Sequence, residues 1–219
     1  MKYFDTETTI VAIAAVSTDW STAVNDPETT VDLGDDAVAT PGCLFAPKVS
    51  AALNGRIGRS VKMHKVKVRG HVQVLAQSGL NAADNAAYCR ILLVMDTQTN
   101  ATQMTGDQLL NGASAANSTI NSFQNPNFFG RFRVLKDKIY KLENPSLAGE
   151  VAATNVIQSG LVMPFKWSVN LRGEEVHFNA TNGGTVADIV DKSLHIVAGT
   201  NNNNLAPTLS YYTRVAYKK

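Results

Sequence analysis

Short runs in which apolar and polar residues alternate follow one another along most of the chain. The clearest is Val61–Leu75, where valines alternate with lysine, arginine, histidine and glutamine. A period of two places alternate side chains on opposite faces of a β-strand, so this pattern predicts a strand with one buried face. Similar runs bounded by glycine, asparagine, proline and serine predict eight strands in all. They are Tyr3–Val16, Val61–Leu75, Arg90–Thr97, Arg131–Leu142, Met163–Leu171, Glu175–Ala180, Ser193–Gly199 and Leu209–Lys218.

Signals for helices are few. Thr105–Asn111 predicts one or two helical turns after a threonine cap, and Thr185–Asp191 predicts the same with Thr185 and Asp188 at the spacing of a partial capping box. Because strands and helices do not alternate, the pattern excludes a doubly wound α/β fold. Long, irregular connections between eight strands indicate a sandwich or jelly roll. No linker or internal repeat divides the chain, so we expect one domain over residues 1–219.

Three connections carry specific signals. Arg172–Gly173 lies between two strand-like runs and predicts a hairpin that joins them. Asn182–Gly184 offers several positions that tolerate a positive φ. The connection between Arg90–Thr97 and Arg131–Leu142 is about thirty residues long, and loops of that length tend to be functional.

The overall composition narrows the class of protein. The charged fraction is 17%, below the roughly one quarter usual for globular domains, and the apolar fraction is 44%. A low charge density suits a chain that buries much of its surface against copies of itself, and it also suits a secreted, sugar-decorated domain. The net charge of +2 is too small for a chain that binds nucleic acid over its whole surface, so such a role requires a local basic patch.

The sequence carries no signal for export or membrane insertion. The apolar run Ile10–Val16 is short and follows acidic residues, which is the wrong order for a signal peptide. No run approaches the ~20 apolar residues of a transmembrane helix. We therefore expect a soluble protein that is not secreted and has no membrane partner.

Residues with catalytic or metal-binding potential are scattered. Cys43 and Cys89 form no CxxC pair and predict two free, buried thiols. His64 and His71 are separated by an odd number of positions in one predicted strand, so they point to opposite faces unless a bulge, for example at Gly70, intervenes. No nucleophile elbow, zinc-protease motif or phosphate loop occurs. We expect no enzymatic activity, no metal and no cofactor.

The strongest local feature is a basic face on Val61–Leu75. The alternation puts His64 and the valines on one face, and the opposite face carries Lys65, Lys67, Arg69, His71 and Gln73. Cations about 7 Å apart on a strand roughly match the phosphate spacing of a nucleic-acid strand. A solvated face whose lysines discourage aggregation explains the same residues. The predicted strand Arg131–Leu142 is also basic, with Arg131, Arg133, Lys136, Lys138 and Lys141.

Three stretches carry a resemblance to a known family. R-I-L-L-V-M-D-T-Q-T-N at Arg90–Asn100 is followed by F-Q-N-P-N at Phe123–Asn127 and by R-F-R-V-L-K-D-K at Arg131–Lys138. In this order they resemble the capsid proteins of small viruses with circular single-stranded DNA genomes, which are similar to the coat protein of satellite tobacco necrosis virus. One strand of that family reads roughly R-x-x-L-V-x-D-x-Q-x-N-G, and a later one reads R-F-x-I-L-x-D-K. Ala101 stands where the family has the glycine.

Weaker matches extend the resemblance over nearly the whole chain. Lys2–Thr6 resembles the K-x-F-D-T that opens the family's shell domain, and Arg56–Val61 resembles R-x-G-x-x-I/V before a long basic strand. Asn182–Thr185 resembles the turn before the penultimate strand. Leu209–Tyr217 with Arg214 resembles the final strand.

The resemblance implies a single eight-stranded jelly roll of two packed four-stranded antiparallel sheets, with short helical turns in the loops. It implies a structural protein whose copies, about sixty of them, assemble into an icosahedral shell around a single-stranded nucleic-acid genome. The location would be the virion, assembled in the cytoplasm or nucleus of a host cell, and the identity of the receptor on the host surface is unknown. The loops Asn100–Asn127 and Ser17–Asn54 would form the exposed surface of the shell or its symmetry-axis contacts.

The resemblance also assigns roles to residues. It favours contacts to nucleic acid or to a neighbouring subunit for Lys65, Lys67, Arg69, Arg133, Lys136, Lys138 and Arg214, and structural roles for Arg131 and Asp137. Family members carry an Arg/Lys-rich arm before the K-x-F-D-T segment, and this sequence starts at that segment, so we expect shells that are empty or hold nucleic acid weakly. Two alternatives stay open. One is a carbohydrate-binding jelly-roll module, and the other is an enzyme on a cupin-like sandwich, which the histidine spacing disfavours.

Overall fold

The computed structural model describes ten strands and three short helical turns. The described residues are 1–13, 29–30, 40–74, 77–80, 86–111, 120–143, 155–157, 161–202, 204–205 and 207–219. The strands are β1 (Lys2–Ala12), β2 (Thr29–Thr30), β3 (Ser60–Val74), β4 (Gln77–Leu80), β5 (Ala86–Asp96), β6 (Phe132–Glu143), β7 (Asn155–Ile157), β8 (Leu161–His177), β9 (Ser193–Thr200) and β10 (Thr208–Lys218). The turns are α1 (Gly106–Leu109), η3 (Pro126–Phe128) and η5 (Val186–Asp188). The all-β prediction is confirmed.

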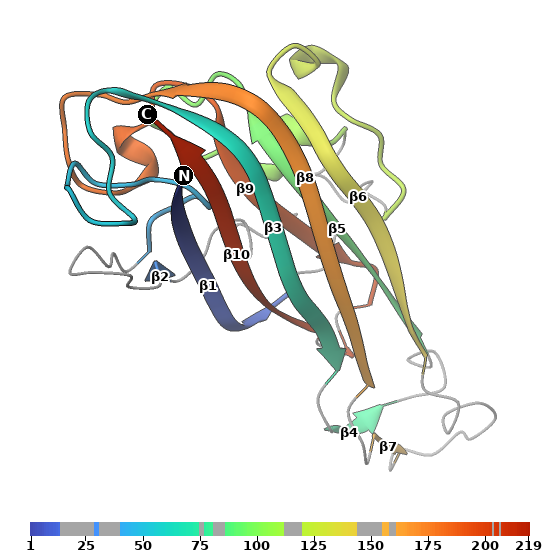
Figure 1. The fold of residues 1–219 in the computed structure, drawn as a ribbon. Helices are drawn as coiled ribbons and strands as arrows, with labels where there is room; N and C mark the ends of the chain where they lie inside the picture. Colours follow the sequence, from blue (N-terminus) through green and yellow to red (C-terminus); the bar gives the residue numbers. More distant parts are fainter. Residues whose placement is uncertain are drawn as a thin grey trace.

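Two antiparallel sheets face each other and form a sandwich (Figure 1). One sheet has the order β2-β1-β10-β3-β8, the other has the order β6-β5-β9, and the short β4 and β7 pair with each other. The last strand lies between the first and the third, an order consistent with a jelly roll. The predicted eight-stranded sandwich is confirmed, and among the described residues its strands divide five and three rather than four and four.

The main core lies between the sheets and follows the alternation in the sequence. Val66, Val68, Val72 and Val74 of β3 are fully buried, while the residues between them are partly or fully exposed. Burial of each such side chain contributes about 1.5–3 kcal/mol relative to exposure. From Val66 to Val74 the period of two therefore identified the inward face of the strand correctly.

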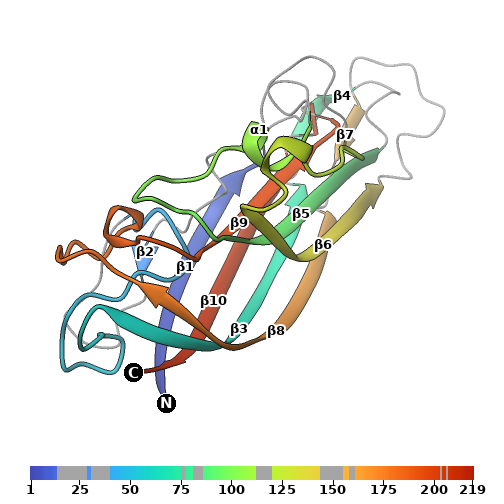
Figure 2. The same cartoon turned by 90° about the horizontal axis from the view of Figure 1, so that it is seen from above.

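A second apolar cluster covers the outer face of the three-stranded sheet. Leu92, Val94 and Val197 point outward from this sheet and pack against Met104, Leu109 and Leu110 of the connection between β5 and β6. This connection lies over β5 and β9 with α1 in it (Figure 2). The described part of the long loop Asn100–Asn127 is thus a packed cover. It explains why β5 reads as a continuous apolar run instead of an alternating one.

The predicted hairpin at Arg172–Gly173 is wrong, because β8 runs through this site as one strand. On either side of it, Glu174 pairs with Met63 and Asn170 pairs with Lys65, so three residues of β8 oppose one residue of β3. Arg172 and Gly173 have φ values of 54° and 81°. Because both flanking stretches of β8 stay paired with β3, the extra residues form a β-bulge, and Arg172 and Gly173 adopt positive φ values within it.

The residue of β3 opposite this bulge is His64. The pairing of β3 with β10 also skips His64, passing from Met63 to Lys65. The inward-facing positions consequently change from odd numbers (Val61, Met63) to even numbers (Val66, Val68). His64, predicted on the core face, is a partly exposed bulge residue.

Both predicted helical turns are present. The backbone N–H of Thr105 donates to Gln108 Oε1 at 3.4 Å, and the backbone N–H of Thr185 donates to Asp188 Oδ2 at 3.0 Å. These are the reciprocal contacts of a capping box, and they fix α1 and η5 in their loops. Within the described ranges no helix is long and apolar enough to cross a membrane.

Candidate nucleic-acid interface

Cations gather on the outer face of the five-stranded sheet. Lys65, Lys67 and Arg69 of β3 are exposed, as predicted. Arg214 of β10 lies directly opposite Lys67, and Lys166 of β8 lies opposite Arg69. Residues directly opposite in antiparallel strands share a face. We call this set, Lys65, Lys67, Arg69, Lys166 and Arg214, the basic face.

Most of the basic face has no acidic partner. Among the described residues, no carboxylate forms an ion pair with Lys65, Lys67, Arg69 or Lys166. Like charges directly opposite on neighbouring strands destabilise a sheet by a few tenths of a kcal/mol. A row of unneutralised cations therefore costs the free chain some stability, and an anionic ligand would recover it.

Arg214 differs from the other members, because it is bound to Asp5. Its Nε donates to Asp5 Oδ1 at 2.8 Å and its Nη2 donates to Oδ2 at 2.6 Å, while the Tyr212 hydroxyl donates to Oδ2 at 2.5 Å. The hydrogen bond to Asp5 raises the pKa of Arg214. Burial, together with the Asp5 carboxylate, raises the pKa of Tyr212 to about 12. Arg214 is thus partly neutralised within the chain, although its side chain remains 46% exposed.

Two shallow hollows adjoin on this face. One has a volume of about 250 Å³ and is lined by Lys67, Arg69, Tyr212 and Arg214. The other has a volume of about 360 Å³ and shares Arg69 and Tyr212 with the first. Cations next to an aromatic ring are the groups with which proteins bind the phosphates and bases of single-stranded nucleic acid. Sequence reasoning missed Lys166 and Tyr212. Their alternating runs could have placed them on a polar face, but the register that brings them to Arg69 comes only from the fold.

Arg133, Lys136 and Lys138 do not join the basic face, because β6 belongs to the other sheet. Arg133 Nη1 lies 2.8 Å from Glu174 Oε1 of β8, and Glu174 Oε2 lies 3.2 Å from Lys192 Nζ. The hydrogen bond from Arg133 lowers the pKa of Glu174. Arg133 is therefore a link between the two sheets.

Lys136 and Lys138 are exposed on β6. Lys138 Nζ lies 5.2 Å from the centroid of the Tyr140 ring, a cation–π distance. Their predicted contact with nucleic acid or a neighbouring subunit stays a prediction.

Arg131 and Asp137, expected to be structural, both form ion pairs within the chain. Arg131 makes two hydrogen bonds, at 2.9 and 2.7 Å, to the fully buried Asp96. Asp137 accepts from Arg90 at 2.9 and 2.6 Å. Arg90 also donates to the backbone oxygens of Ile120 and Ser122, which fastens the cover segment to the sheet.

Two of the histidines have polar neighbours in the part of the chain that the structure describes. His195 is fully buried beside Ser193 Oγ at 2.6 Å, and His177 Nδ1 lies 2.9 Å from Asp191. No three His, Cys, Asp or Glu side chains among the described residues could hold a metal ion. Neither Cys43 nor Cys89 forms a disulfide, both are buried, and burial raises the pKa of the Cys89 thiol to about 12.

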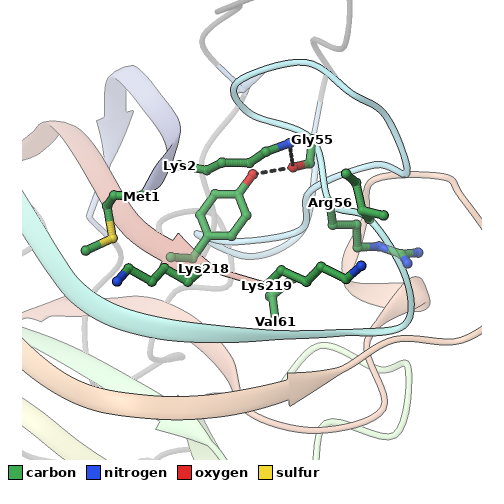
Figure 3. A pocket seen from close by; sticks show the side chains of 9 residues that line it. Met1, Lys2, Gly55, Arg56, Val61, Lys218 and Lys219 are labelled. Carbon is green, nitrogen blue, oxygen red and sulfur yellow. Dashed lines mark hydrogen bonds between the residues drawn. The ribbon is translucent and has the colours of Figure 1, made fainter.

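The segments Lys2–Thr6 and Arg56–Val61, which carry part of the resemblance, meet at a hollow of about 290 Å³ near both chain ends (Figure 3). The carbonyl oxygen of Gly55 accepts from Tyr217 Oη at 2.6 Å and from Lys2 Nζ at 2.9 Å. Arg56 is buried, and its guanidinium donates to the carbonyl oxygens of Pro47, Gly58 and Thr181. Burial lowers the pKa of Arg56, while the Asp188 carboxylate opposes this shift. These contacts fix the loop 47–58.

Comparisons with known proteins add little. No family model matches the chain, and no curated protein matches it. Among solved structures, the chain is similar to the cryo-EM structure of Broad Bean Stain Virus, with 9% sequence identity and a TM-score of 0.29 over 100% of this chain and 85% of the other. A TM-score this low supports no inference about function.

Proposed function

We propose that this chain is a viral capsid protein whose copies assemble into an icosahedral shell of about sixty subunits around a single-stranded nucleic acid. In this proposal it is a structural protein of a virion and has no catalytic activity. The resemblance of its motifs to the capsid proteins of circular single-stranded DNA viruses supports this, as does the jelly-roll order of its strands. Because one fold serves many functions, the proposal also has to rest on the residues of the candidate interface.

The observation that carries the proposal is the basic face. Four of its cations, Lys65, Lys67, Arg69 and Lys166, have no carboxylate partner among the described residues. They lie on one face of two neighbouring strands, β3 and β8, and Lys67 and Arg69 line the same hollow as Tyr212. A phosphate backbone supplies the missing negative charges at a similar spacing. In a shell this face would be turned inward, toward the genome.

The first test is the size of the particle. We expect purified protein to form particles of about 1.4 MDa, which is about sixty copies of a 23.5 kDa chain. Size-exclusion chromatography with light scattering measures the mass, and negative-stain electron microscopy shows whether the particles are closed. A chain that stays a monomer or small ring at every protein and salt concentration would contradict the shell and favour the carbohydrate-binding module.

A further inference from the structure

Large apolar side chains are exposed on two loops that are far apart in the sequence. Of twelve exposed large apolar residues in the described chain, five lie on these loops. Val49, Leu53 and Ile57 on the loop 47–58 form what we call the apolar knob, with Leu53 66% exposed. Phe123 and Phe129, on either side of η3, form what we call the aromatic patch, with Phe123 85% exposed. Exposed apolar groups of this size mark interaction surfaces.

The apolar knob is held on a rigid backbone. Besides the three hydrogen bonds from Arg56 and the two at Gly55, Lys2 Nζ donates to the carbonyl oxygen of Ala52 at 2.7 Å. Backbone pairing between residues 48–50 and Arg56 closes the loop, with Ser50 N to Arg56 O at 3.0 Å. A surface that is already ordered loses little conformational entropy when it binds.

The aromatic patch is held in the same way. Asn125 Nδ2 donates to the carbonyl oxygen of Asp107 at 2.9 Å, and the backbone N–H of Asn125 donates to Leu109 O at 2.8 Å. The carbonyl oxygen of Phe123 accepts from Asn111 N at 2.8 Å. Phe123 is therefore presented to solvent by an ordered backbone.

The two surfaces carry complementary charge. Besides the buried Arg56, residues 40–59 contain the partly exposed Lys48 and the exposed Arg59, and no acidic residue. Residues 102–129 contain one charged residue, the exposed Asp107, whose backbone oxygen accepts a hydrogen bond from Asn125 between Phe123 and Phe129. A basic apolar surface and an acidic apolar surface attract each other, and two copies of either one repel.

The loop 47–58 and η3 lie at the same end of the sandwich, where β3 and β6 begin, and they stand apart from each other in both views (Figures 1 and 2). A contact between unlike surfaces of two subunits is heterologous, and it closes into rings when the rotation allows. We propose that the apolar knob of one copy packs on the aromatic patch of the next copy. This inference rests on the proposed shell, because it names the surfaces by which neighbouring subunits meet.

Disulfide trapping tests the contact. The native cysteines are buried, so introduced cysteines on the surface react alone. Two double variants, Leu53→Cys/Phe123→Cys and Ile57→Cys/Phe129→Cys, are assembled, oxidised and run on a non-reducing gel. In at least one of them we expect a ladder of dimers, trimers and larger species, since each copy is linked to two neighbours. The matched control is Leu53→Cys/Val162→Cys, which places the second cysteine on an exposed site of β8 outside both surfaces, and it should stay monomeric on the gel.

The possible results distinguish a wrong contact from a wrong proposed function. Shells that form without any cross-link in either double variant would overturn the contact and leave the shell intact. Dimers from Leu53→Cys alone would overturn it too, because they would place knob against knob. A wild-type chain that never assembles would overturn the proposed function and this contact together. As an independent check, Leu53→Asp and Phe123→Asp should each shift the wild-type particle toward the 23.5 kDa monomer.

Discussion

Glu174 is a single residue that joins the two sheets. It lies on β8 of the five-stranded sheet, and it binds Arg133 of β6 at 2.8 Å and Lys192, just before β9, at 3.2 Å. The sequence singled out Arg133 as a ligand for nucleic acid, but not its partner 41 positions away. Ion pairs between the two sheets depend on how the sheets stack, and the local sequence around either residue does not predict this stacking.

The Glu174 contacts make stability depend on pH. Because the Arg133 hydrogen bond lowers the pKa of Glu174 in the folded chain, the unfolded chain binds more protons near pH 4. The stability that Glu174 contributes is therefore fully present above the pKa of about 4.3 that a glutamate has in the unfolded chain. It is lost as the pH falls through the lowered pKa of Glu174 in the folded chain. Since the three side chains are partly exposed, we expect Glu174→Gln to lower the free energy of unfolding by about 1 kcal/mol at neutral pH.

Urea unfolding of the wild type and of Glu174→Gln checks this. The difference between them should shrink toward zero as the pH falls through the lowered folded-state pKa, because Glu174 then becomes protonated in both states. An equal deficit at neutral and acid pH would mean that the glutamine disturbs packing instead of removing an ion pair.

The bulge in β8 shows which features of an element are local and which are not. Strands such as β3 and β10 were predictable, because alternation reports one buried face. The Arg172–Gly173 pair was predicted as a hairpin turn, but the local sequence does not show whether the chain turns back there or bulges. That choice depends on β3, a partner about a hundred residues earlier, which pairs with both sides of the site. The basic face was likewise predictable only in part. Lys65, Lys67 and Arg69 lie on one strand, so alternation placed them on one face. Lys166 and Tyr212 lie beside Arg69 only because of the register between strands.

A glycine pair tests the bulge. A Cβ on Gly173 would meet nothing closer than His64 Cε1 at 3.9 Å, so Gly173→Ala changes only the preference for φ, which is 81° here. We expect it to destabilise the chain by about 1–2 kcal/mol in urea unfolding. Gly130→Ala is the control, because its Cβ would meet nothing within 4 Å and its φ is ordinary. The control should be neutral or slightly stabilising, and a similar loss in both variants would argue against strain at the bulge.

At the scale of the whole molecule, the small net charge of +2 hides an uneven distribution. Among the described residues, cations without a carboxylate partner concentrate on the outer face of one sheet, while those of β6 are divided between ion pairs, ring contacts and solvent. A bulk attraction of the shell for nucleic acid would depend on total charge alone. Binding at a specific interface would weaken only when cations of that interface are removed.

Two triple variants separate these cases. Lys65→Gln/Lys67→Gln/Arg69→Gln removes three charges from the basic face, and Lys136→Gln/Lys138→Gln/Lys141→Gln removes three from β6. We expect shells of the first variant to lose packaged nucleic acid, seen as a fall in the ratio of absorbance at 260 and 280 nm, and shells of the second to match the wild type. The first variant should also unfold at the same or a higher urea concentration, because repulsion between opposite like charges is relieved. Equal losses of nucleic acid in both variants would show that packaging depends on total charge. An unchanged absorbance ratio in the first variant would show that the basic face does not bind nucleic acid and is a solvated surface that discourages aggregation.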